Sequence, residues 1–283
     1  MQKKIETAKT LMDAFPFIKR FSGETIVVKY GGAAQIDPTL KEKFATDIAL
    51  MCLVGIKVVI VHGGGKKINE ILEKLNIEVN FIDGQRVTRP EDMEIIEMVL
   101  SGLVNKEITA LLNHSGAKAM GISGKDALFM KAEAKDSEKF GLTGNIVSVD
   151  ADVIKRLLND KFTPVIAPIA SGGSSGHPGY NINADFAASY IAKSINARKV
   201  IFLTDTAGVL DKGSNLLSTL KLDNINTLIE NGTISGGMIP KVNACLEAVE
   251  GGVRKAHIID GRIEHSLLLE LFTSDGIGTV IKK

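Results

Sequence analysis

The sequence predicts an α/β fold with a mostly parallel central sheet. Short runs of apolar, β-branched residues alternate along the chain with longer segments whose apolar residues recur every three or four positions, and this alternation is typical of α/β proteins. The clearest example is the stretch 57–75, where the apolar run 58–61 is followed by three glycines at 63–65 and then by a helical pattern. Backbone N–H groups at such a turn can converge on an anion, so we expect a carboxylate or a phosphate there.

The composition limits the class of protein. The 283 residues include 45% hydrophobic and 24% charged side chains, and the net charge is +1, so the chain can bury a large core and no global field indicates nucleic acid or an anionic membrane surface. No apolar run has the length of a signal peptide core or a membrane span, and Cys52 and Cys245 are expected to be buried, reduced thiols. We therefore predict a cytoplasmic protein whose partners are small molecules and other copies of itself.

The first part of the chain is predicted to hold a helix and two strand–glycine units. Residues 1–22 have the pattern of an amphipathic helix that Pro16 interrupts, and its apolar face would pack on its own domain or on a neighbouring subunit. Residues 25–30 are apolar enough for a buried strand. The pair Asp37-Pro38 then opens a helix with proline in its first turn, and the pattern at 68–75 places another helix after the second glycine turn.

The middle of the chain is predicted from capping and turn signals. Thr88 and Glu91 have the spacing of a capping box ahead of a long helix over 93–111. The runs 127–130 and 145–149 lie between glycines and charged residues, which indicates hairpins at a sheet edge.

The last part alternates strands with helices. Asp150 is expected to cap a helix, and the glycine- and serine-rich loop 171–177 is interpreted as mobile surface or a lid. Lys241 is placed in about the first turn of a helix that runs to Glu250. Further strands are expected at 162–167, 199–205, 256–260 and 278–281.

Several charged residues are candidates for binding an anion at the carboxyl edge of the sheet, where open α/β sheets bind their ligands. Lys29 ends an apolar strand and requires a neutralising anion, whereas Lys241 lies near a helix start, where a cation opposes the helix dipole. Each lysine alone could be a solvated surface residue, but two lysines facing glycine turns favour a functional site. Arg86 could grip a carboxylate or form a structural salt bridge, and Asp185 could stabilise a helix N-terminus or orient a lysine. His62 is interpreted as structural.

Common nucleotide-binding patterns do not fit. Neither glycine turn spells G-x-G-x-x-G, and the nearest P-loop match, at 119–126, lacks the first glycine and has Asp where Mg²⁺ needs a hydroxyl. No cluster has metal-ligand spacing, and no Ser/His/Asp or Cys/His pair has local support. Any nucleotide is therefore expected to be held in another way.

Six segments, taken together, resemble the amino acid kinase family over the chain from Thr25 to its C-terminus: KYGG (29–32), VIVHGGG (59–65), GQRVT (84–88), NINAD (181–185), FLTDTAGVL (202–210) and GGMIPK (236–241). The resemblance implies a three-layer αβα sandwich with an acceptor-binding N-lobe at 23–196 and an ATP-binding C-lobe at 197–283. Within the family, GQRVT and NINAD point away from uridylate and carbamate kinases and toward members that phosphorylate N-acetyl-L-glutamate.

The same resemblance implies roles for individual residues. The γ-phosphoryl group of ATP, with Mg²⁺ carried mainly by the nucleotide, would pass to the side-chain carboxylate of N-acetyl-L-glutamate, a step of arginine synthesis. The residues implied in catalysis are Lys29, Lys241 and Asp185. Those implied in binding the acceptor are Gly64, Gly65, Arg86, Asn181 and Asn183. Those implied in binding ATP are Gly31, Gly32, Thr204, Asp205, Gly208, Val209, Leu210, Gly237 and Met238.

The two ends of the chain resemble arginine-inhibited members of the family. The N-terminal helix and the tail HSLLLELFTSDGIGT (265–279) imply a hexamer, a trimer of dimers joined through these helices, with L-arginine bound as an inhibitor. The positions that match this arginine site are Lys199, His257, Glu270 and Gly276. Two alternatives stay open, a related kinase for another acylated amino acid and a non-catalytic sensor of arginine or acetylglutamate. A sensor would not need both lysines and Asp185.

Overall fold

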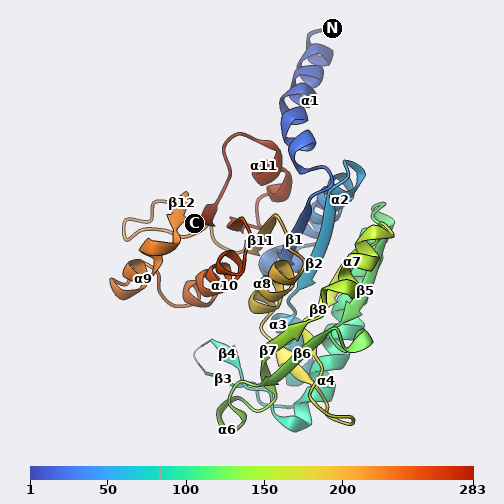
Figure 1. Cartoon of the computed structure of the whole chain (residues 1–283), viewed down its shortest axis with the longest axis vertical. Helices are drawn as coiled ribbons and strands as arrows, with labels where there is room; N and C mark the ends of the chain where they lie inside the picture. The colour runs from blue at the N-terminus through green and yellow to red at the C-terminus, as the bar shows by residue number, and fades with distance from the viewer. Residues whose placement is uncertain (83) are drawn as a thin grey trace.

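The computed structural model of the chain describes residues 1–82 and 84–283. Its centre is one eight-stranded sheet (Figure 1). In sheet order the strands are β12 (Thr219–Lys221), β14 (Thr279–Lys282), β13 (Lys255–Asp260), β11 (Lys199–Thr204), β1 (Thr25–Tyr30), β2 (Lys57–His62), β8 (Thr163–Ala167) and β5 (Ala119–Ser123). The strands from β13 to β5 run parallel, and β14 lies antiparallel to β13.

Helices cover both faces of this sheet. The helices packed on one face are α7 (Ala151–Asn159), α8 (Ala184–Ser194), α9 (Leu222–Glu230) and α10 (Met238–Glu250). Those on the other face are α2 (Pro38–Leu53), α3 (Gly65–Lys74), α4 (Met93–Glu97), α5 (Asn105–His114) and α11 (Ser266–Phe272). The predicted α/β class and three-layer sandwich are therefore confirmed.

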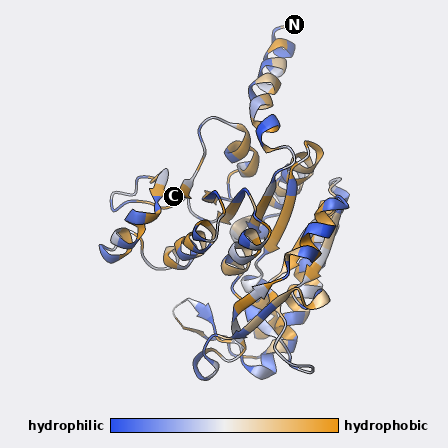
Figure 2. Ribbon diagram, in the orientation of Figure 1, coloured by the Kyte–Doolittle hydropathy of each residue, from blue (hydrophilic) through white to orange (hydrophobic). Residues whose placement is uncertain are grey.

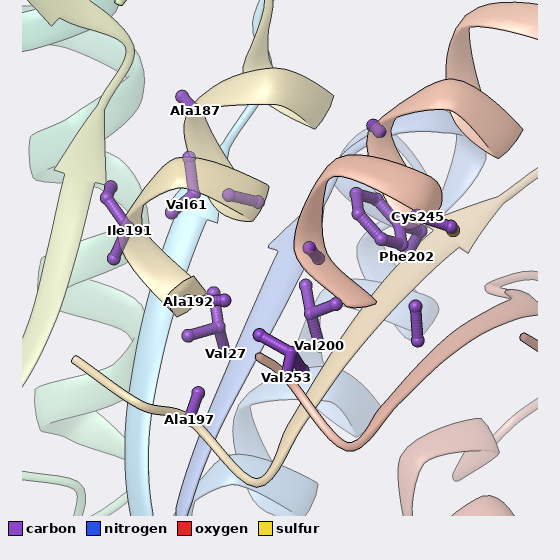
Figure 3. Packing of buried hydrophobic residues seen from close by; sticks show 14 of the residues in the cluster. Val27, Val61, Ala187, Ile191, Ala192, Ala197, Val200, Phe202, Cys245 and Val253 are labelled. Carbon is purple, nitrogen blue, oxygen red and sulfur yellow. The ribbon is translucent and has the colours of Figure 1, made fainter. Parts of the chain in front are cut away.

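The two hydrophobic cores divide along each central strand. In β1, Val27 packs into the core beneath α8 and α10, whereas Ile26 and Val28 pack into the core beneath α2 and α11, as the alternation of side chains along a strand requires. Figure 3 shows Val27, Val61, Val200 and Phe202 facing α8 and α10, and Figure 2 shows hydrophobic residues concentrated on the central strands. Cys245 and Cys52 are free thiols, as predicted. Cys245 is buried in the core beneath α8 and α10, whereas Cys52 is only partly buried, contrary to the prediction.

Smaller elements lie around the central sheet. A second, four-stranded sheet has the order β6 (Met130–Ala134), β7 (Thr143–Val149), β10 (Tyr180–Ile182) and β9 (Ile169–Ala170). The other short elements are β3 (Phe81–Ile82) paired with β4 (Gln85–Arg86), α6 (Ser137–Phe140), the 3₁₀ turns η1 (Gly32–Gln35), η2 (Pro90–Asp92) and η4 (Asp126–Leu128), and the π-helical segment η3 (Met98–Val104).

Helix α1 (Gln2–Phe21) projects from the rest of the chain (Figure 1). The predicted interruption at Pro16 is wrong, because the helix continues past Pro16 as one element. Only Phe21 is buried, and the apolar side chains Leu11, Met12 and Phe15 are more than half exposed. No helix of residues 1–82 and 84–283 combines the length and the apolar character that crossing a membrane requires.

Two local predictions in the middle of the chain are wrong. Thr88 and Glu91 form no capping box, since Arg89 occupies the N-cap of η2 without a side-chain cap bond. The run 127–130 is not a strand, because Asp126–Leu128 is a 3₁₀ turn and β6 begins only at Met130. The hairpin at a sheet edge is confirmed, because β6 is antiparallel to β7 and is an edge strand of the second sheet.

Candidate active site

One buried carboxylate joins the two candidate lysines. Asp185, in the first turn of α8, is 6% exposed. Lys29, the next-to-last residue of β1, places Nζ 3.0 Å from Asp185 Oδ1 as an ion pair. Lys241, in the first turn of α10, donates a 3.0 Å hydrogen bond to Asp185 Oδ2. The fold thus brings together three residues that are far apart in the sequence.

The charge state of Asp185 follows from this contact. Burial alone would raise the pKa of Asp185, but the positive charges of Lys29 and Lys241 outweigh it and lower the pKa from 3.8 to about 2. The carboxylate is therefore ionised at neutral pH and holds two ammonium groups at one point. The N-cap residue Asn183 fixes the start of α8, because its Oδ1 accepts hydrogen bonds from Asp185 N and Phe186 N.

The glycine turn after β2 shares a cavity with two of the three charged residues, Lys29 and Asp185. A cavity of about 200 Å³ is lined by Lys29, Asp185 and the glycines 63–65. A second cavity of about 550 Å³ shares Lys29 and the same glycines and extends over Gly31 and Gly32. Gly64 has no room for a side chain, since a Cβ there would lie 2.5 Å from Leu100 Cδ2. Lys29 lines both cavities, whereas Lys241 lines neither and reaches the site through its bond to Asp185.

Arg86 lines the smaller cavity from β4. It is 9% exposed, and its Nη2 donates to Gly65 O over 3.2 Å and to Asn69 Oδ1. The guanidinium also lies over the ring of Phe81, with Cζ 4.8 Å from the ring centroid. These contacts hold a planar cation next to the glycine turn, in reach of a carboxylate in the cavity.

Asn181 lines the same cavity from β10 and is tied to two buried threonines. Its Nδ2 donates to Thr88 Oγ1 over 3.0 Å, and Thr143 Oγ1 donates to Arg86 O over 2.7 Å. Thr88 Oγ1 lies 3.0 Å from Thr143 Oγ1. This network uses the Thr88 hydroxyl that a capping box would have needed.

The residues expected to bind ATP fall into two groups. Gly31 and Gly32 line the larger cavity, and Asp205 reaches this turn, because its Oδ1 accepts a 2.6 Å hydrogen bond from Ala33 N. Gly32 has φ +70°, and a Cβ there would lie 2.3 Å from Asp205 Oδ1. The others lie at the end of β11, in the segment after it or at the start of α10, and none of them lines either cavity: Thr204, Gly208, Val209, Leu210, Gly237 and Met238. Val209 is buried, and its N–H donates to Thr279 Oγ1.

The four residues of the expected arginine site lie together, near the end of α1. His257 Nδ1 lies 2.7 Å from Glu270 Oε1, and Gly276 leaves no room for a Cβ beside Glu270. Burial lowers the pKa of Lys199 to about 8, and its Nζ lies 5.0 Å from the ring centroid of Phe21. Lys199 is the first residue of β11, at the edge of the sheet opposite to the glycine turns.

A comparison with known protein families matches most of the chain, including the candidate active site. The model of the amino acid kinase family matches residues 24–260, which include the three charged residues and both glycine turns. The chain belongs to the amino acid kinase family. The resemblance drawn from the sequence motifs is thereby confirmed.

Individual relatives in the amino acid kinase family are similar in sequence over nearly the full chain. The acetylglutamate kinase of Sulfurimonas denitrificans is 67% identical over 281 residues, and that of Nitratiruptor sp. is 64% identical, with 99% of each chain covered in both comparisons. Among solved structures, N-acetylglutamate synthase from Neisseria gonorrhoeae, complexed with coenzyme A and N-acetyl-glutamate, superposes with a TM-score of 0.86 at 27% identity. That match covers 98% of this chain, which spans 63% of the synthase chain.

The family motifs left some residues around the cavity unassigned. The site prediction omitted Asn69, Phe81, Thr88 and Thr143, which the structure places on Arg86 or Asn181. A signal existed for Asn69, because it lies four residues after Gly65 and so on the same face of α3. The threonines gave no local signal, since their partners come from other elements.

Proposed function

We propose that this chain transfers the γ-phosphoryl group of ATP to the side-chain carboxylate of N-acetyl-L-glutamate, forming N-acetyl-L-glutamyl 5-phosphate for arginine synthesis. The observation that carries the proposal is the pair of lysines on Asp185, 3.0 Å away on each side, next to an open glycine turn. The full-length similarity to curated acetylglutamate kinases supports this choice of acceptor.

The reaction needs charge neutralisation more than proton transfer. An oxygen of the acceptor carboxylate attacks the γ-phosphorus, and the bond to the β–γ bridging oxygen breaks, so ADP leaves with the electron pair. The carboxylate is already a nucleophile, and no general base is required. Lys29 and Lys241 neutralise the oxygens of the phosphoryl group in transfer, and ionised Asp185 keeps both lysines aligned.

The acceptor would lie in the smaller cavity. Backbone N–H groups of Gly64 and Gly65 would hold the reacting carboxylate, while Arg86 would bind the other carboxylate in a bidentate manner. Asn181 would hold the rest of the molecule, and Asn183 would act mainly by capping α8. Gly31 and Gly32 would approach the phosphates of ATP, with the segment 204–210, Gly237 and Met238 near adenine and ribose.

The side chains of the site do not provide a cage for Mg²⁺. Within residues 1–82 and 84–283, no three His, Cys, Asp or Glu side chains are grouped so that they could hold an ion. Both oxygens of Asp185 face lysines. The Mg²⁺ of the nucleotide would therefore be carried by phosphate oxygens, whose charge it neutralises.

We also propose that L-arginine inhibits the enzyme from the opposite edge of the sheet. Glu270 and Lys199 offer a carboxylate and an ammonium to the two charged ends of arginine, and buried His257 Nε2 has no hydrogen-bond partner in the described chain. The exposed apolar residues of α1 would join dimers into a hexamer. In this scheme the segment 1–22 transmits the state of the arginine site. The N-lobe (23–196) binds the acceptor, and the C-lobe (197–283) binds ATP. The enzyme would be cytoplasmic.

An acceptor screen tests the proposal. ADP release coupled to NADH oxidation is measured with ATP and N-acetyl-L-glutamate, with N-acetyl-L-aminoadipate, or with no acceptor. We expect acetylglutamate to give the highest kcat/KM. A preference for aminoadipate would indicate a related kinase, and binding of acetylglutamate or arginine without ADP release would indicate a sensor.

A further inference from the structure

A series of buried hydrogen bonds connects α5 to the glycine turn of the site. Asn105, the first residue of α5, is fully buried, and its Nδ2 lies 3.1 Å from Nε2 of the equally buried His62. His62 ends β2, and its Nδ1 lies 2.8 Å from the carbonyl oxygen of the next residue, Gly63. Neither Asn105 nor His62 has a role in the mechanism above.

The donors and acceptors in this series of hydrogen bonds can be assigned from the other groups that contact Asn105. Asn105 Nδ2 lies 2.9 Å from the carbonyl of Val165, and Lys106 Nζ donates to Asn105 Oδ1 over 3.1 Å. Both contacts require Nδ2 to be the amide nitrogen, so it donates to His62 Nε2. His62 Nε2 is therefore unprotonated, and the proton on Nδ1 is donated to Gly63 O.

Burial supports the neutral form of this histidine. His62 is fully buried, and burial lowers the pKa of its imidazole to about 4, with the charge of Lys106 acting in the same direction. At neutral pH the ring therefore carries one proton, and the neighbours place it on Nδ1. The His62 Nδ1–H group is therefore a fixed donor to the carbonyl of Gly63 in the glycine turn.

The contacts on Gly63 O fix the direction of the Gly64 N–H. The Gly63 carbonyl and the Gly64 N–H belong to one planar, trans peptide unit and point in opposite directions. The carbonyl accepts from His62 Nδ1 and also from Gln35 Nε2 over 3.0 Å, so the peptide plane is held by two donors. Gly64 N–H has no acceptor in the described part of the chain and is left for the acceptor carboxylate.

The π-helical segment η3 explains how Asn105 reaches His62. A π segment contains an extra residue relative to an α-helix and changes the direction of the side chains after it. Here it ends immediately before Asn105 and also presents Leu100 to Gly64, where a Cβ would lie 2.5 Å from Leu100 Cδ2. Segment η3 and Asn105 thus contact both the glycine backbone and the histidine behind it.

We propose that His62 and Asn105 are positioning residues, which orient and polarise the Gly63–Gly64 peptide so that Gly64 N–H binds the reacting carboxylate. This inference rests on the proposed kinase reaction. The bonds from Asn105 Nδ2 to His62 Nε2 and from His62 Nδ1 to Gly63 O run in one direction, so each strengthens the next and makes Gly64 N–H a better donor.

Nitrogen NMR on the folded protein tests the hydrogen bonds without any activity. In ¹⁵N-labelled wild-type protein, His62 is expected to show a protonated Nδ1 and an unprotonated Nε2 at pH 7, and the Gly64 amide resonance is expected to shift on titration with N-acetyl-L-glutamate. A protonated Nε2 in the wild-type protein overturns the proposal. Because neither signal depends on turnover, a failure of the proposed function can be distinguished from a failure of this inference.

The variant Asn105→Asp tests the catalytic consequence. An aspartate of the same size cannot donate to Nε2, so the proton should move to Nε2 or the ring should become doubly protonated. We expect kcat to fall by about 10- to 100-fold, the range that a misplacement of up to about 1 Å can cause, with the KM for ATP within about twofold.

Asn113→Asp is the matched control. Asn113 lies two turns further along α5 and makes hydrogen bonds with Ala119 N and O, away from the glycine turn. The substitution should leave kcat and the His62 signals unchanged, although it also removes a side-chain amide donor from α5, here at an exposed residue whose bond to Ala119 O is partly buried. Equal kcat values in the two variants overturn the proposal. If Asn105→Asp does not fold, the wild-type NMR signals still decide.

Discussion

Replacing Lys241 with methionine removes one of the two ammonium groups and keeps an unbranched side chain. The Nζ of Lys241 lies 3.0 Å from Asp185 Oδ2, and the side chain is 22% exposed, so water screens its charge only in part. We expect kcat to fall strongly while the KM values of both substrates change little, because the charge acts mainly on the phosphoryl group in transfer.

The size of the effect can be worked from this geometry. Two unit charges about 3 Å apart, a contact like the 3.0 Å one to Asp185, interact with roughly 5 kcal/mol at an effective dielectric constant of about 20. If roughly half a charge develops near the ammonium in the transition state, the stabilisation is about 2–3 kcal/mol, which corresponds to a roughly 30- to 150-fold fall in kcat.

Lys193→Met is the matched control. Lys193 of α8 pairs with Glu247 of α10, so this substitution also removes an ion pair between the same two helices. It lies two turns beyond Asp185 along α8, and a partly exposed pair contributes at most about 1 kcal/mol to stability. The coupled ADP-release assay should give a wild-type kcat for this variant. Equal falls in kcat for Lys193→Met and Lys241→Met, or a change confined to KM in Lys241→Met, would refute the reasoning.

Other variants test charge, packing and regulation. The folded pKa of Asp185, about 2, lies below its ordinary value of 3.8, so ionised Asp185 stabilises the fold by about 2 kcal/mol above pH 4, and this is lost as the pH falls toward 2. Urea unfolding should therefore show a larger deficit for Asp185→Asn at pH 7 than at pH 3, and an equal deficit contradicts this. Gly64→Ala places Cβ 2.5 Å from Leu100 Cδ2, so its loss of unfolding free energy and that of Leu100→Ala should sum to more than the loss in the double variant; strict additivity would exclude the clash. Deleting residues 1–20 should abolish the proposed hexamer in analytical ultracentrifugation and weaken the proposed arginine inhibition while kcat is kept; an unchanged assembly and unchanged inhibition would count against the proposed role of α1.

The strands next to the site could be predicted because their signals are local. The apolar residues 25–30 and the run 58–61 lie in strands that the structure places at Thr25–Tyr30 and Lys57–His62. Proline in the first turn after Asp37 correctly marked the start of α2, where Asp37 accepts from Leu40 N. Strand ends and glycine turns together determined where Lys29 would lie.

The wrong capping-box prediction and the unpredicted π-helical segment involve residues whose partners lie far away in the sequence. Thr88 has the local chemistry of an N-cap, but its hydroxyl bonds to Thr143 and Asn181, which no spacing within the helix reveals. The segment η3 reads as an ordinary amphipathic helix, and its extra residue is explained only by the contacts of Leu100 and Asn105 with the glycine turn. At these positions tertiary contacts, and not the local sequence preference for a helix or a cap, determine the backbone conformation.

A crystal structure with ADP, N-acetyl-L-glutamate and aluminium fluoride tests the central claim most directly. The fluoride plane occupies the position of the phosphoryl group between the two substrates. We predict that the Nζ atoms of both Lys29 and Lys241 lie within hydrogen-bonding distance of that plane, with Asp185 still between them. A structure in which either ammonium group points into solvent, away from the fluoride, would contradict the account.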